Sequence, residues 1–79
     1  MNELAHRRAY WLTRLMAEHG WRAADLARHA KLGARSGGQL IREWAKLGSQ
    51  PRDANLEAVS KALGVCPSTF HRPIPEATP

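Results

Sequence analysis

Glycine and proline divide this chain into short segments whose apolar residues recur every three or four positions, and this pattern constrains its fold most. Leu26, Ala27 and Ala30 follow the spacing in one segment, and Ile41 and Trp44 follow it in the next. Such spacing is typical of amphipathic helices, and no segment shows the alternation of a β-strand. The sequence therefore predicts an all-α fold of short, packed helices.

Capping residues and breakers predict where these helices begin and end. Asn2 is a candidate N-cap, and Gly20 and Gly64 stand where a left-handed residue closes a helix. Ser36 is a candidate N-cap for the third helix, after an expected turn at about 32–35. The prediction is five helices, at about 2–19, 22–31, 37–47, 53–63 and, after Pro67, 67–70.

The apolar side of each predicted helix supplies the expected core. Trp44 is expected inside because it shares a face with Leu40 and Ile41. The other core candidates are Leu4, Ala5, Trp11, Leu12, Leu15, Met16, Leu26, Ala27, Ala30, Leu47, Leu56, Val59, Ala62, Leu63 and Phe70.

Length and composition predict a single domain. The 79 residues leave room for one core, expected within residues 1–71, followed by a proline-rich flexible tail over 72–79. No apolar run approaches the roughly 20 residues of a membrane-spanning helix. The N-terminus shows no apolar stretch of a secretory signal, and the lone Cys66 excludes an internal disulfide. We therefore expect a cytoplasmic protein with no membrane partner.

A net charge of +5 favours a nucleic-acid partner, because dispersed Lys and Arg neutralise phosphates. Charge alone leaves an ordinary basic protein equally open. The distribution adds to the argument, since cations surround the expected turn and only Asp25 lies near them; these cations are Arg22, Arg28, Lys31 and Arg35.

Several residues appear in an order that resembles the lambda-repressor-like (Cro and XRE) family of helix-turn-helix DNA-binding domains. They span most of the chain: Gly20-Trp21, Leu26-Ala27, Ile41, Trp44, Gly48, Pro51, Leu56, Ala62-Leu63-Gly64-Val65 and Pro67. The resemblance implies a five-helix domain whose third helix enters the major groove of double-stranded DNA. It also implies a sequence-specific transcriptional regulator of phage or bacterial type, a repressor acting in the nucleoid or an infected host.

This chain departs from the family pattern at three places. Arg22 and Ala23 stand where the family usually has a capping Ser or Thr followed by Gln. Lys31 falls where the family usually has the turn glycine. The spacing from Leu26-Ala27 to Ile41 is several residues longer than in the family.

In the register set by Ile41, the resemblance places part of the third helix against base edges. Gln39 can pair with adenine, Arg42 with guanine, and Glu43 can accept from cytosine. Gly37 and Gly38 would let the backbone approach DNA closely. The alternative for Arg42 and Glu43 is an ordinary solvated helix face. The expected base contacts are Ser36, Gly38, Gln39, Arg42 and Glu43.

Polar and basic residues around these positions are the expected phosphate contacts, which position a domain without selecting a sequence. They are Arg22, Arg35, Lys46, Ser49, Gln50 and Arg52. Any one of them could instead be an ordinary surface residue. Three arginines on the first helix, Arg7, Arg8 and Arg14, are expected to be solvated.

A module of this size buries too little surface for tight specific binding alone, so a homodimer on an inverted repeat is expected. Its interface would come from the region of Phe70 or from the tail. A second hypothesis is an antitoxin or adaptor that docks a protein partner through the tail, with Ile74 as anchor. No catalytic set or metal-ligand spacing is evident, so neither an enzyme nor a cofactor is expected.

Overall fold

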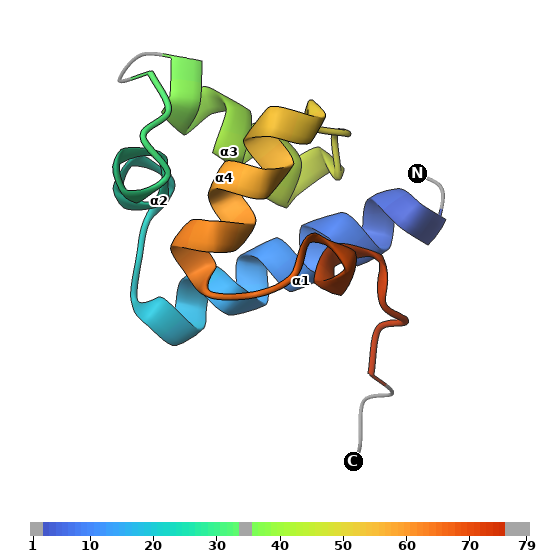
Figure 1. Cartoon of the computed structure of the whole chain (residues 1–79). Coiled ribbons are helices and arrows are strands. Elements are labelled where there is room, and N and C mark those ends of the chain that lie inside the picture. The colour runs from blue at the N-terminus through green and yellow to red at the C-terminus, as the bar shows by residue number, and fades with distance from the viewer. Residues whose placement is uncertain (1–2, 34–35, 76–79) are drawn as a thin grey trace.

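The computed structural model of the chain describes residues 3–33 and 36–75, and within them the fold is all-α. Four α-helices follow one another along the chain (Figure 1): α1 Glu3–His19, α2 Ala23–His29, α3 Ser36–Leu47 and α4 Asp53–Leu63. The predicted count of five helices is wrong. In place of the fifth there is one short 3₁₀ helix, η1, Pro67–His71, in which the N–H of Thr69 donates to the carbonyl of Cys66 at 2.9 Å.

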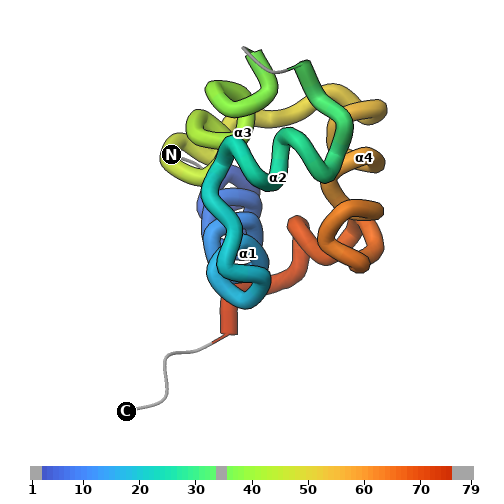
Figure 2. Tube along the Cα trace, turned by 90° about the vertical axis from the view of Figure 1, so that its left-hand side faces the viewer, coloured from blue at the N-terminus to red at the C-terminus, as the bar shows by residue number. Residues whose placement is uncertain are grey.

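The longest helix, α1, forms one side of the molecule, and the other elements pack against it or against one another (Figure 1). Helix α2 lies between α3 and α4 in the view of Figure 2 and contacts both. The C-terminal η1 returns to α1, although the two are far apart in the sequence. This arrangement leaves one long side of α3 facing solvent.

The core draws on every element, as the apolar spacing predicts. Leu12, Leu26, Ile41 and Val59 come from the four α-helices and are fully buried. Trp44 is 1% exposed, which confirms the predicted core position, and its ring lies 5.0 Å from the ring of Phe70.

Two leucines predicted to be buried are instead exposed. Leu47, in the last turn of α3, is 55% exposed although it follows the buried Trp44 by three residues. Leu4, one turn before Arg8, is 47% exposed at the start of α1. Both sit in terminal turns, where neighbouring elements do not cover their side chains.

All four α-helices are followed by a residue with positive φ, at Gly20, Lys31, Gly48 and Gly64. At the end of α2, the backbone N–H of Leu32 donates to the carbonyl of Ala27 at 2.8 Å, and that of Lys31 donates to Arg28 at 3.1 Å. This paired closure requires the left-handed conformation, and Lys31 adopts it at φ 59° without being glycine. The tight exit from α2 is therefore preserved despite the departure noted in the sequence.

The end of α3 packs closely against α1 and is hydrogen-bonded to it. Gly48 has φ 67°, and a Cβ built there would overlap the backbone carbonyl of Ala5. The Nε of Arg8 donates to the carbonyl oxygen of Gly48 at 2.9 Å. Arg8 is 8% exposed, so the expectation that it is solvated is wrong: its stem fills the α1–α3 junction and its head meets the carboxyl end of α3.

Two hydrogen bonds tie the end of η1 and the first residue of the predicted tail to α1. The indole Nε1 of Trp11 donates to the carbonyl of Arg72 at 3.0 Å, and Nη1 of Arg7 donates to that of His71 at 3.1 Å. Residues 73–75 are exposed. None of the helices in the described ranges is long and apolar enough to cross a membrane.

Candidate nucleic-acid interface

One face of α3 carries polar and charged side chains into solvent. Buried residues recur along α3 every three or four positions. Ile41 and Trp44 therefore point into the core, whereas Gln39, Arg42 and Glu43 are exposed. The exposed polar residues of α3 are Ser36, Gln39, Arg42, Glu43 and Lys46. The structure thus brings four of the five predicted base contacts, all but Gly38, onto one accessible face.

Two of these side chains are already joined. The amide Nε2 of Gln39 donates to Oε1 of Glu43 at 3.2 Å, across one helical turn. This contact orients the amide and leaves its oxygen free to accept from outside. Arg42 has no ion pair with any residue of the described ranges, so its guanidinium keeps its donors available.

The two glycines of α3 do not open the backbone to an outside partner. A Cβ at Gly37 would lie 2.8 Å from the Cβ of Leu32 and 3.1 Å from that of Ala27. Gly37 therefore allows α2 and α3 to approach each other, which corrects the expectation of a close approach to DNA. Gly38 is also buried, and a Cβ there would lie 3.9 Å from Nη1 of Arg42. This surface accordingly presents Arg42 and not the backbone of Gly38.

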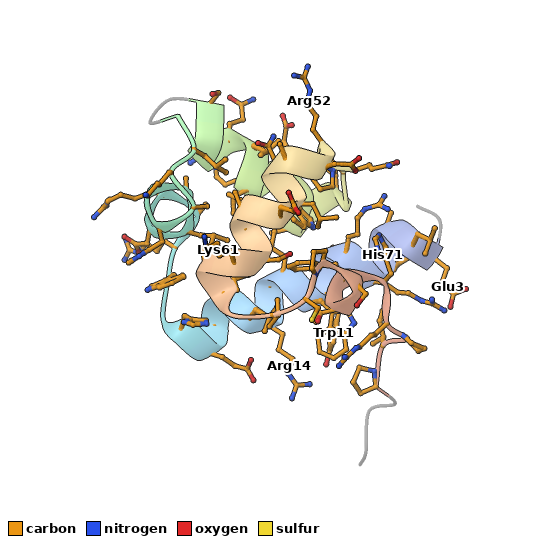
Figure 3. All side chains as sticks on the ribbon, in the orientation of Figure 1. Glu3, Trp11, Arg14, Arg52, Lys61 and His71 are labelled. Atoms are coloured by element: carbon orange, nitrogen blue, oxygen red, sulfur yellow. The ribbon has the colours of Figure 1, made fainter. Side chains whose placement is uncertain are left out.

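Most of the predicted phosphate contacts lie in the last turn of α3 or follow it in the sequence, and one of them, Arg52, lines a hollow with Ser36 and Gly37 at the start of α3. Lys46 lies in its last turn, Gln50 and Arg52 are exposed in the segment between α3 and α4, and Ser49 is half-buried there. Figure 3 shows Arg52 projecting from the molecule at the end opposite to Arg14. Arg35, the remaining candidate in this part of the chain, lies outside the described residues.

Arg22 precedes α2 and is exposed. Its backbone N–H donates to Oδ2 of Asp25 at 2.9 Å, which is one half of a capping box. The guanidinium has no acceptor atom and so cannot supply the other half. It is left directed to solvent, beside the face of α3.

Two of the three arginines of α1, unlike Arg42 of α3, pair with acids on their own helix. Arg7 pairs with Glu3, and Arg14 lies 3.8 Å from Glu18. Arg14 also donates to the hydroxyl of Tyr10 at 2.8 Å, and this hydrogen bond raises the pKa of the Arg14 guanidinium above its usual value. Excess positive charge therefore lies on the α2–α3 side.

Arg8 is the residue of this region that sequence reasoning missed. A usable signal was present, because Arg8 follows Ala5 by three residues and precedes Leu12 by four, which places it on the buried face of α1. Its partner, Gly48, is 40 residues away, and nothing in the sequence around Gly48 marks its carbonyl as the acceptor for Arg8.

Two further predictions concern contact surfaces and metals. In the region predicted to supply a dimer interface, Phe70 itself is fully buried, while Pro67, Ser68 and, in the tail, Ile74 are exposed. In the described ranges, no three His, Cys, Asp or Glu side chains come together as metal ligands.

Comparisons of this chain with family models, with curated proteins and with solved structures found no match.

Proposed function

We propose that the protein is a sequence-specific double-stranded DNA-binding regulator in which α2 and α3 form a helix-turn-helix of the lambda-repressor-like kind. The observation that carries the proposal is the accessible face of α3, where Gln39, Arg42 and Glu43 project together from a helix fixed by the core. An α-helix with such a face fits the major groove of B-DNA, and these three side-chain types can distinguish bases there.

Arg42 is the strongest candidate for base recognition. It is exposed and lacks an ion pair among the described residues, and a guanidinium forms two parallel hydrogen bonds with guanine O6 and N7. Gln39 would contact the neighbouring base through its amide, already oriented by Glu43. Ser36, at the first position of the helix, would lie deepest along the same face.

Phosphate contacts would hold α3 in this orientation. Arg22 before α2 and Lys46 near the end of α3 line one hollow, whereas Arg52 lies near the start of α3, beside Ser36 and Gly37. Cations at these points contribute affinity on every sequence and set the register of the helix on the duplex. Ser49 and Gln50 would add neutral contacts to the same strand.

A homodimer is part of the proposal, since one α3 covers too few base pairs for specific binding by itself. Two copies related by a two-fold axis would bind half-sites about one helical turn apart, some 34 Å. The exposed apolar side chains Leu4, Leu47 and Ile74 are the available contacts between copies. The exposure of Ile74 also favours the second candidate, a protein-docking adaptor of antitoxin type.

The proposal is tested by titrating duplex DNA from immediately upstream of the gene with wild-type protein and two variants. Arg42→Ala should lower the preference for the target over a scrambled duplex, and Arg52→Ala should weaken binding to both alike. Equal and salt-independent binding to every duplex, or none, would reject the regulator. A complex with a protein partner formed through Ile74 would then favour the adaptor.

A further inference from the structure

A hollow of about 600 Å³ opens where α1, the start of α2 and the second half of α3 meet. This is within the range of roughly 300–1,000 Å³ usual for small-ligand sites. Its apolar part is made of methionine and alanine side chains, and its charged part consists only of cations. The lining residues are Met16, Ala23, Ala24 and Ala45, together with Arg22, Arg42 and Lys46.

The positive charge at this hollow is not neutralised by the protein. None of its three cations makes an ion pair with a residue in the described ranges, and no carboxylate lines it. In contrast, Nη2 of Arg28 on α2, outside the hollow, lies 3.5 Å from Oδ1 of Asp25. The hollow thus combines an apolar surface with unpaired guanidinium and ammonium groups, two from α3 and one from the residue that precedes α2.

We propose that this hollow binds a small amphipathic organic anion, a carboxylate on an aromatic or branched aliphatic body. The body would cover Met16, Ala23 and Ala45, which removes apolar surface from water. The carboxylate would meet Arg42 and Lys46, where a guanidinium can donate two parallel hydrogen bonds. An uncharged ligand would not pair with the cations, and an inorganic anion would not cover the apolar surface.

This site gives the anion a means to control DNA binding. Arg42 and Lys46 belong both to the hollow and to the proposed DNA-contacting face, so one guanidinium cannot serve both partners at once. Anion and DNA would therefore compete, and each would weaken the binding of the other by the same factor. This consequence, unlike the site itself, rests on the proposed function.

The site is tested on the free protein, without DNA, by following backbone amide NMR shifts during titration with benzoate. Benzamide has the same body without charge, and acetate has the charge without the ring. We expect saturable shifts from benzoate at Ala24 and Ala45, with a millimolar Kd because the ligand has few atoms. Shifts from acetate equal to those from benzoate would overturn the proposal, as would absence of saturation.

Matched variants locate the site. Ala24→Leu fills the hollow from an exposed position on α2 and should abolish the shifts, whereas Ala54→Leu, exposed on α4, should not. Lys46→Gln should weaken benzoate binding about two- to fivefold, the effect of one partly exposed ion pair. Arg28→Gln, outside the hollow, should leave it unchanged. Unaltered binding by Ala24→Leu would overturn the assignment.

The regulatory consequence has a separate measurement. Benzoate should release a bound duplex at concentrations where equal ionic strength of acetate does not. Benzoate that binds the free protein without releasing DNA would reject competition. A protein that binds benzoate but no duplex would reject the proposed function and leave the anion site supported.

Discussion

The Nε of Arg8 donates a hydrogen bond to the carbonyl oxygen of Gly48 over 2.9 Å, across 40 residues of chain. Gly48 is the residue that closes α3, and its backbone contacts that of Ala5 so closely that no side chain fits between them. Helix α1 therefore fixes the end of the helix that carries the proposed DNA-contacting face. This junction holds α3 at one end, while Gly37 packs against α2 at the other.

Replacing Arg8 with Met should destabilise the protein while preserving most of the packing of the arginine stem. The buried carbonyl of Gly48 would lose its side-chain donor, which costs about 1–3 kcal/mol. Urea unfolding followed by circular dichroism measures the change. Arg14→Met, on the same helix with its side chain half-exposed, should leave the unfolding midpoint nearly unchanged, and equal losses for both variants would contradict the account.

Gly48→Ala and Gly64→Ala separate steric overlap from backbone strain, since the two glycines have φ values of 67° and 73°. A Cβ at Gly64 meets nothing within 4 Å, so only the strain of about 1–2 kcal/mol is expected there. Gly48→Ala adds an overlap with Ala5 and should cost about 2–5 kcal/mol in total. Similar melting temperatures for the two variants would show that the α1–α3 contact is looser than described.

Trp44 should contribute packing and little hydrogen bonding. Its indole N–H is buried with no hydrogen-bond partner among the described residues, so Trp44→Phe loses no such bond. Trp44→Ala, in contrast, opens a cavity beside Phe70 and should cost about 3–5 kcal/mol. Arg42→Ala should melt like the wild type. Should Arg42→Ala unfold the protein while Trp44→Ala does not, the orientation of α3 would have to be reassigned.

Salt dependence tests the proposed phosphate contacts. The logarithm of the DNA-binding constant should fall linearly with the logarithm of salt concentration, by about 0.9 per phosphate neutralised. Arg52→Ala should reduce this slope by about 1. Arg14→Ala serves as the control, because Arg14 lies at the opposite end of the molecule and pairs with Glu18. Equal slopes for all three proteins would exclude Arg52 from the contacts.

The sequence predicts much of this fold because the helical period marks the core residues directly. Leu12, Ile41 and Trp44 are recognisable from spacing alone, and all three are buried. Leu47 satisfies the same spacing and is exposed, because the contact of α1 with this end of α3 at Gly48 does not cover the Leu47 side chain. Periodicity identifies an apolar side, but neighbouring elements decide where burial stops.

The features that fix the candidate site were less predictable, since they depend on contacts between distant elements. A glycine such as Gly37 is typical of a flexible segment or of a close approach to DNA. Only the positions of Leu32 and Ala27 show that it allows α2 and α3 to pack together. The burial of Arg8 is explained by its hydrogen bond to the carbonyl of Gly48, a residue far away in the sequence. The cationic hollow similarly joins Arg22 to Arg42, which lie on different elements and share no local pattern.

The most direct test of the central claim is selection of bound sequences from a randomised duplex library by wild-type protein and by Arg42→Ala. The account predicts that the wild type enriches an inverted repeat with half-sites about one helical turn apart. Arg42→Ala should enrich the same repeat but lose the preference at one base pair in each half, where a contact worth about 1–3 kcal/mol is removed. Enrichment of no sequence by the wild type, or of an identical motif by both proteins, would contradict recognition of DNA through this face of α3.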